Sequence, residues 1–108
     1  MKLKSTKEVN DKVLSALVVH KKLTRKELMF YTGLSDRVCR LAIAELRDAG
    51  HMIGITASGG YSINDTTDFH RAIANYKARA REEERRIRVM EKTLAEYGSL
   101  VEQMEFNI

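Results

Sequence analysis

A regular spacing of apolar residues in the C-terminal third is the feature that most restricts the fold of this chain. From Phe69 to Met104, apolar side chains recur at alternating intervals of four and three residues. This heptad repeat is typical of an α-helix that packs along a second helix. The d positions are Phe69, Tyr76, Glu83, Met90, Tyr97 and Met104, and the a positions are Ile73, Ala80, Ile87, Leu94 and Val101. Among them only Glu83 is charged.

The repeat predicts a long helix over residues 66–108 and a two-stranded coiled coil. With no proline in the chain, the helix could span roughly 60 Å, although Gly98 is expected to weaken it beyond Tyr97. In a parallel pair, Arg79 and Arg86 would face glutamates of the second chain. The predicted dimerisation residues are Phe69, Ile73, Tyr76, Ala80, Ile87, Met90, Leu94 and Tyr97. The alternatives are a helix that folds back on the rest of the chain or stands partly free.

Residues 1–65 are predicted to begin with helices near residues 8–20 and 25–32. The first has apolar residues at helical spacing: Val9, Val13, Leu14, Leu17 and Val18. Thr24 and Glu27 have the spacing of a capping box, and Gly33 is a suitable left-handed stop for the second helix. Its expected core contacts are Leu28, Met29 and Tyr31.

A third helix is predicted after the N-cap residue Ser35, with Asp36 in its first turn, and is expected to end near Ala49. At about 100° per residue, one stripe of this helix is apolar and should face the core. That stripe consists of Cys39, Ala42, Ile43 and Leu46. The opposite side carries Arg37, Leu41 and Ala44, with Arg40 beside them.

Two short apolar alternations follow, 53–55 and 61–63, around a turn that contains Gly59 and Gly60. They predict a β-hairpin whose tip, from Thr56 to Gly60, lacks large side chains. Between Ile53 and Asn64 there is no lysine or arginine.

The order of these elements, and the residues from Leu23 to Ile63, resemble the small winged helix-turn-helix proteins of bacteria and their phages. The matching motifs are T-x-x-E-L at Thr24, G-L-S-x-R at Gly33, and E-L-x-x-x-G at Glu45. The return of the hairpin at Tyr61 resembles phage and mobile-element members. The resemblance covers about 41 of the 108 residues and implies a third helix that enters the DNA major groove.

On this resemblance, the exposed side of the third helix is expected to contact DNA. Its arginines suit phosphate or guanine, and Leu41 suits a thymine methyl group. The predicted DNA-binding residues are Ser35, Arg37, Arg40, Leu41, Ala44, Lys22, Arg25, Lys26, Thr56 and Ser58. The alternatives are solvated charges on the surface and, for Leu41, packing on another protein or on the C-terminal helix.

Composition sets the remaining expectations. Residues 1–65 hold eleven lysines and arginines against seven acidic residues, whereas residues 66–108 hold eight of each. The excess positive charge therefore lies in the part that resembles a DNA-binding domain. A single cysteine and the lack of a signal peptide or a membrane span fit a cytoplasmic protein. No spacing indicates an enzyme, a metal site or a cofactor.

Together these features predict a mainly α fold with a small β-hairpin: a winged helix-turn-helix over residues 1–65, followed by a coiled-coil helix. The expected function is sequence-specific binding of double-stranded DNA by a homodimeric transcription regulator of phage or mobile-element origin. One alternative is a phage replication or packaging accessory that binds DNA and recruits phage or host proteins through its C-terminal helix. Another is a winged helix used only for protein–protein interaction.

Overall fold

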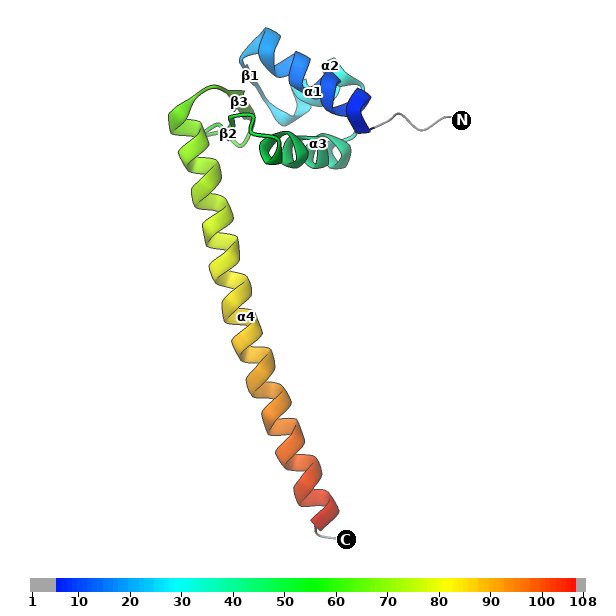
Figure 1. The fold of residues 1–108 in the computed structure, drawn as a ribbon, viewed down its shortest axis with the longest axis vertical. Helices are drawn as coiled ribbons and strands as arrows, with labels where there is room; N and C mark the ends of the chain where they lie inside the picture. The colour runs from blue at the N-terminus through cyan, green and yellow to red at the C-terminus, as the bar shows by residue number, and fades with distance from the viewer. Residues whose placement is uncertain (1–5, 107–108) are drawn as a thin grey trace, which may run out of the picture. The chain divides into compact units, whose positions relative to one another are not determined.

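A computed structural model of the chain describes residues 6–106. The fold is mainly helical, with a small three-stranded antiparallel sheet and a long C-terminal helix (Figure 1). The helices are α1 (Thr6–His20), α2 (Arg25–Thr32), α3 (Asp36–Asp48) and α4 (Thr66–Phe106), and the strands are β1 (Lys22–Leu23), β2 (Ile53–Ile55) and β3 (Tyr61–Ile63).

The predicted starts and stops of α2 and α3 are confirmed. Thr24 and Glu27 form both hydrogen bonds of a capping box, at 3.1 and 2.9 Å. Gly33 ends α2 in the left-handed conformation, with φ of 70°. The hydroxyl of Ser35 then accepts the N–H of Val38 and caps α3. These local signals leave a three-residue turn between the two helices, from Gly33 to Ser35.

The core lies between the first three helices and the sheet. The predicted stripe of α3 is confirmed, because each of its four residues is buried. The core residues are Val13, Leu17, Leu23, Leu28, Cys39, Ala42, Ile43, Leu46, Ile53 and Tyr61.

One predicted core contact is wrong, because Tyr31 is half exposed. Thr32 is buried instead. Its hydroxyl donates to the carbonyl of Leu28 at 2.7 Å, so the burial leaves no unsatisfied polar group in the core.

The sheet contains one strand more than the predicted hairpin. β1 pairs with β3, so the strand order is β1–β3–β2. Two glycines of the sheet region, Gly60 just before β3 and Gly54 in β2, lie very close to a neighbouring backbone. A Cβ on Gly60 would lie 2.4 Å from the carbonyl oxygen of Leu23, and one on Gly54 would lie 2.4 Å from the carbonyl carbon of Asp68.

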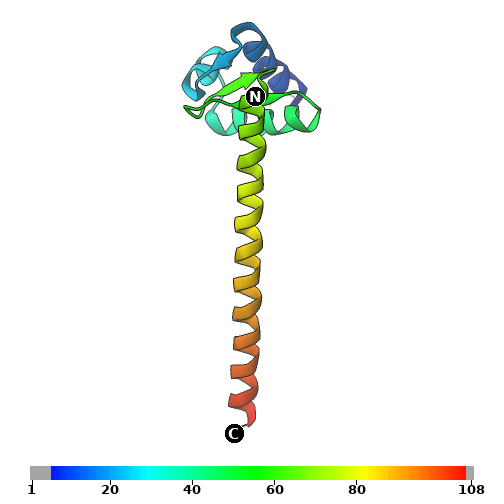
Figure 2. The same ribbon diagram turned by 90° about the vertical axis from the view of Figure 1, so that its left-hand side faces the viewer.

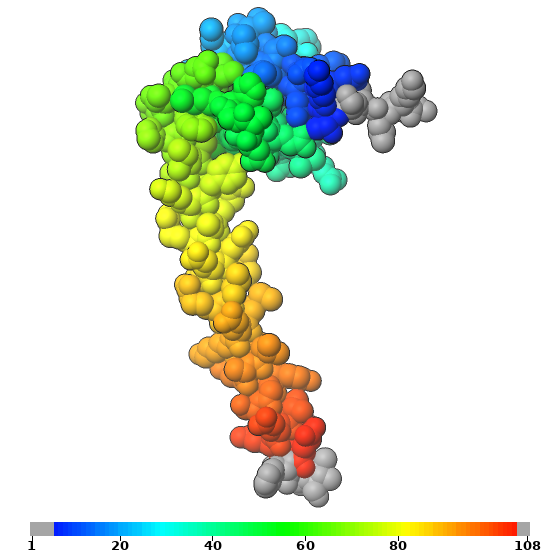
Figure 3. Space-filling view, viewed as in Figure 1, coloured from blue at the N-terminus to red at the C-terminus, as the bar shows by residue number. Residues whose placement is uncertain are grey.

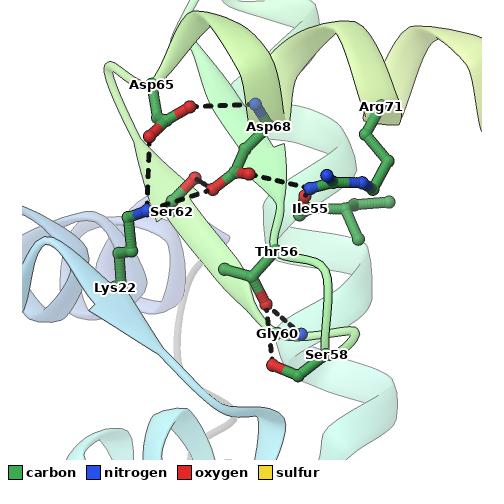
Figure 4. Close-up of polar contacts among 9 residues, drawn as sticks. All are labelled: Lys22, Ile55, Thr56, Ser58, Gly60, Ser62, Asp65, Asp68 and Arg71. Carbon is green, nitrogen blue, oxygen red and sulfur yellow. Dashed lines mark hydrogen bonds and ion pairs between the residues drawn. The ribbon is translucent and has the colours of Figure 1, made fainter.

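The first turns of α4 are joined to the sheet by a buried carboxylate (Figure 4). Asp68 accepts a hydrogen bond from the hydroxyl of Ser62 at 2.7 Å and pairs with Arg71 at 2.8 Å. Arg71 also donates to the carbonyl of Ile55. Lys22 of β1 lies 3.3 Å from Asp65 and 3.7 Å from Asp68. The charge of Asp68 is therefore compensated on several sides, as burial requires.

The chain divides into two compact units, the first ending at Ala74 and the second beginning at Asn75. The first unit thus includes the start of α4, where Ala72 is buried. In the second unit α4 is one unbroken helix (Figures 1 and 2) that continues through Gly98. The expected weakening at Gly98 does not end the helix.

Candidate nucleic-acid interface

The solvent side of α3 is the candidate interface, and the buried stripe on its other side fixes its orientation. Arg37, Arg40 and Leu41 are exposed, and the small residue Ala44 among them is partly buried. Leu41 has 57% of its surface exposed. A second anchor lies near the end of the helix, where Arg47 donates to the carbonyl of Ile53 in β2 at 2.7 Å.

An acidic residue organises two of the arginines that the sequence associates with DNA. Asp36 accepts hydrogen bonds from Nε and Nη2 of Arg25, the first at 3.0 Å. Its second oxygen also lies 3.1 Å from Nε of Arg40, one turn further along α3. The hydrogen bonds from Arg25 hold the pKa of the Asp36 carboxyl below its usual range, and Asp36 raises the pKa of Arg25.

The other basic candidates have different surroundings. Lys22 forms ion pairs with Asp65 and Asp68, so its ammonium group links β1 to the start of α4. The side chains of Arg37 and Lys26 are exposed and make no hydrogen bond or ion pair with any residue between 6 and 106. These two side chains are therefore available to a ligand without loss of an internal contact.

The hairpin tip is occupied by its own hydrogen bonds (Figure 4). The hydroxyl of Thr56 accepts the N–H of Gly60 at 2.9 Å and lies 3.1 Å from the hydroxyl of Ser58. The backbone N–H groups of Thr56 and Gly59 also donate within the tip. One of the two hydroxyl hydrogens of Thr56 and Ser58 is used within the tip, so the two predicted phosphate contacts share one remaining hydroxyl donor.

Leu41 borders a shallow groove between α1 and α3. The groove is lined by Val9, Leu34 and Val38 beside Leu41, and its wall includes Asn10, which donates to Glu45 at 2.8 Å. Leu41 therefore has apolar neighbours on one side and the arginine face of α3 on the other.

An aromatic surface on α1 and α2 was missed by the sequence analysis. The rings of His20 and Tyr31 are stacked with centroids 4.1 Å apart, and Phe30 meets Tyr31 edge-on at 5.4 Å. Phe30 is 82% exposed, and Val19 is 72% exposed. The helical spacing of α2 contained no signal for this surface, since Phe30 and Tyr31 are adjacent and either could have faced the core.

The apolar stripe of α4 is exposed in the single chain. Figure 3 shows the side chains of this helix in space-filling form, coloured from green to red along the chain. Ile73 is 38% exposed, and the values rise to 52% for Ile87 and 70% for Leu94. Phe69, the first predicted dimerisation residue, is already partly buried within the first unit. Tyr76 differs from the other members of the stripe because the guanidinium of Arg79 lies 4.6 Å from its ring centre.

The described residues contain no cluster of three or more potential metal ligands. None of the helices among residues 6–106 has the length and apolar character needed to cross a membrane. Comparison of the chain with protein-family models, with curated proteins and with solved structures gives no match.

Proposed function

We propose that the chain is a winged helix-turn-helix protein that binds double-stranded DNA with α3 as its recognition helix. The observation that carries this proposal is the two-sided character of α3. One side is buried in the core, whereas the other exposes Arg37, Arg40 and Leu41 around the small residue Ala44. A rigidly anchored helix with this surface has the size and chemistry to enter a major groove and contact base edges.

In this proposal the phosphate contacts come from the helices. Arg37 and Lys26 are exposed without internal partners among residues 6–106. Arg25 is half exposed at the start of α2. The β2–β3 hairpin carries no positive charge, so it would contribute shape rather than phosphate binding. Contacts to phosphate position a protein on the duplex, and contacts to bases select its site.

We further propose that α4 forms a parallel coiled coil with a second copy of the chain. Seven of its a and d positions expose large apolar side chains that a second helix would bury: Ile73, Tyr76, Ile87, Met90, Leu94, Tyr97 and Met104. A dimer carries two α3 helices, so its target would contain two half-sites. Binding a defined site as a dimer fits a transcription regulator, and the resemblance of the hairpin favours a phage or mobile-element origin.

The aromatic surface on α1 and α2 favours a second candidate function. Phe30, Tyr31 and Val19 are large apolar residues at a surface, as at many sites of protein–protein contact. The first unit could therefore act as an interaction module without binding DNA.

Titration of labelled random duplex DNA, followed by fluorescence anisotropy at two salt concentrations, separates the candidates. A DNA-binding protein should bind at low salt and weaken as salt rises, because cations are released from the DNA. Arg37→Ala should lower the affinity and reduce the salt slope by about 1. Arg81→Ala, which removes an exposed arginine from α4, is the matched control and should change neither. Absence of binding at low salt would leave only the interaction module.

A further inference from the structure

The acidic residue Asp36 lies at the start of the proposed recognition helix, where a negative charge opposes phosphate. Its side chain nevertheless makes the densest set of contacts on this surface. It accepts two hydrogen bonds from Arg25 and forms an ion pair with Arg40, and it joins the first turn of α2 to the first two turns of α3.

The contact with Arg40 leaves part of that guanidinium free. Asp36 lies 3.1 Å from Nε of Arg40, and neither Nη group of Arg40 makes a hydrogen bond within residues 6–106. The side chain of Arg40 is 59% exposed. A guanidinium paired with a carboxylate through Nε keeps its two Nη groups for a ligand, and this fork is the arrangement that pairs with O6 and N7 of guanine.

We propose that Asp36 determines the sequence selectivity of α3 by holding Arg40 in the orientation that contacts a guanine. Asp36 is thus a positioning residue, and Arg40 makes the contact. This inference rests on the proposed DNA-binding function. It predicts that loss of Asp36 changes the affinity for random DNA little, because those contacts are to phosphate. The same loss should strongly reduce the preference for guanine at one position of the site.

The test first selects binding sites from random duplexes with the full-length protein. Affinities are then measured for the selected site, for the same site with its guanine replaced, and for random duplex. In Asp36→Asn the preference for guanine should fall roughly 10- to 100-fold, the discrimination typical of a bidentate contact. Affinity for random duplex should stay the same or rise, because a negative charge is lost.

Asp48→Asn is the matched control. Asp48 is an exposed carboxylate at the end of the same helix, so its removal changes the charge of α3 by the same amount. It should leave the preference for guanine intact. A second variant, Arg40→Lys, keeps the charge but lacks the fork, and it should lose the preference without disturbing Asp36 or its bond to Arg25.

The outcomes separate this inference from the proposal beneath it. If the full-length protein does not bind duplex DNA, both fail. If it selects a site and Asp36→Asn keeps the guanine preference of the unchanged protein, the positioning role of Asp36 is refuted and DNA binding stands. Equal loss in Asp36→Asn and Asp48→Asn would also refute it, because the effect would then be one of charge alone. Thermal unfolding of each variant checks that it is folded.

Discussion

Replacing Leu94 by alanine should weaken self-association of the chain. Leu94 occupies an a position of the α4 repeat and is 70% exposed in the single chain. Full burial of a leucine side chain contributes about 1.5–3 kcal/mol. Burying the exposed part would contribute roughly 1–2 kcal/mol per chain, and a symmetric dimer loses two such side chains. The expected loss is about 2–4 kcal/mol, which corresponds to a Kd roughly 30- to 1000-fold weaker.

Sedimentation equilibrium over a range of concentrations measures this change directly. Val89→Ala is the matched control, because Val89 is 51% exposed on α4 but lies outside the a and d positions. It should leave the Kd nearly unchanged. Circular dichroism adds a second readout, since a helix without a packing partner is only marginally stable and its helicity should rise with concentration.

Two results would refute the coiled-coil proposal. One is that the chain without substitutions stays monomeric at tens of micromolar, a concentration at which a coiled coil of this length should already dimerise. The other is equal weakening by Leu94→Ala and Val89→Ala, which would mean that association does not use the apolar stripe.

Further predictions concern the stability of the fold and the burial of Cys39. Gly54→Ala should lower the thermal unfolding temperature, because its Cβ would lie 2.4 Å from the backbone of Asp68, whereas Gly98→Ala, in open space, should stabilise its helix by about 1 kcal/mol; equal shifts would contradict the close packing. The pKa values of Asp36 and Asp65 are lowered by hydrogen bonds, so their stabilisation is present above about pH 4 and lost below it; urea unfolding should show a lower midpoint at pH 3 than at pH 5, and equal midpoints would contradict this. Burial raises the pKa of the Cys39 thiol, so Ellman's reagent should react slowly until the protein is unfolded; fast reaction of the native protein would contradict its burial.

Much of the fold could be predicted from the sequence because its signals are local. The capping box at Thr24 and the glycine stop at Gly33 each depend on residues within about one helical turn of that position. The buried stripe of α3 follows from helical spacing alone. In contrast, β1 is two residues long and pairs with Ser62 and Tyr61, far along the chain, so neither periodicity nor a turn indicated it.

The parts that could not be predicted depend on contacts between elements. The sequence shows Asp36 as a charge that opposes phosphate, but its pairing with Arg25 arises only when α2 and α3 pack together. Similarly, the buried role of Asp68 depends on Ser62 in the sheet and not on its place in the first turn of α4. The exposure of Phe30 depends on which face of α2 the core covers.

The measurement that tests the central claim most directly is a titration of the ¹⁵N-labelled protein with duplex DNA, followed by its amide NMR signals. If α3 is the recognition helix, the largest shifts should fall on residues 35–44, and the amides around Phe30 and Tyr31 should change little. Shifts confined to the aromatic surface of α1 and α2, or no shifts at low salt, would contradict the account.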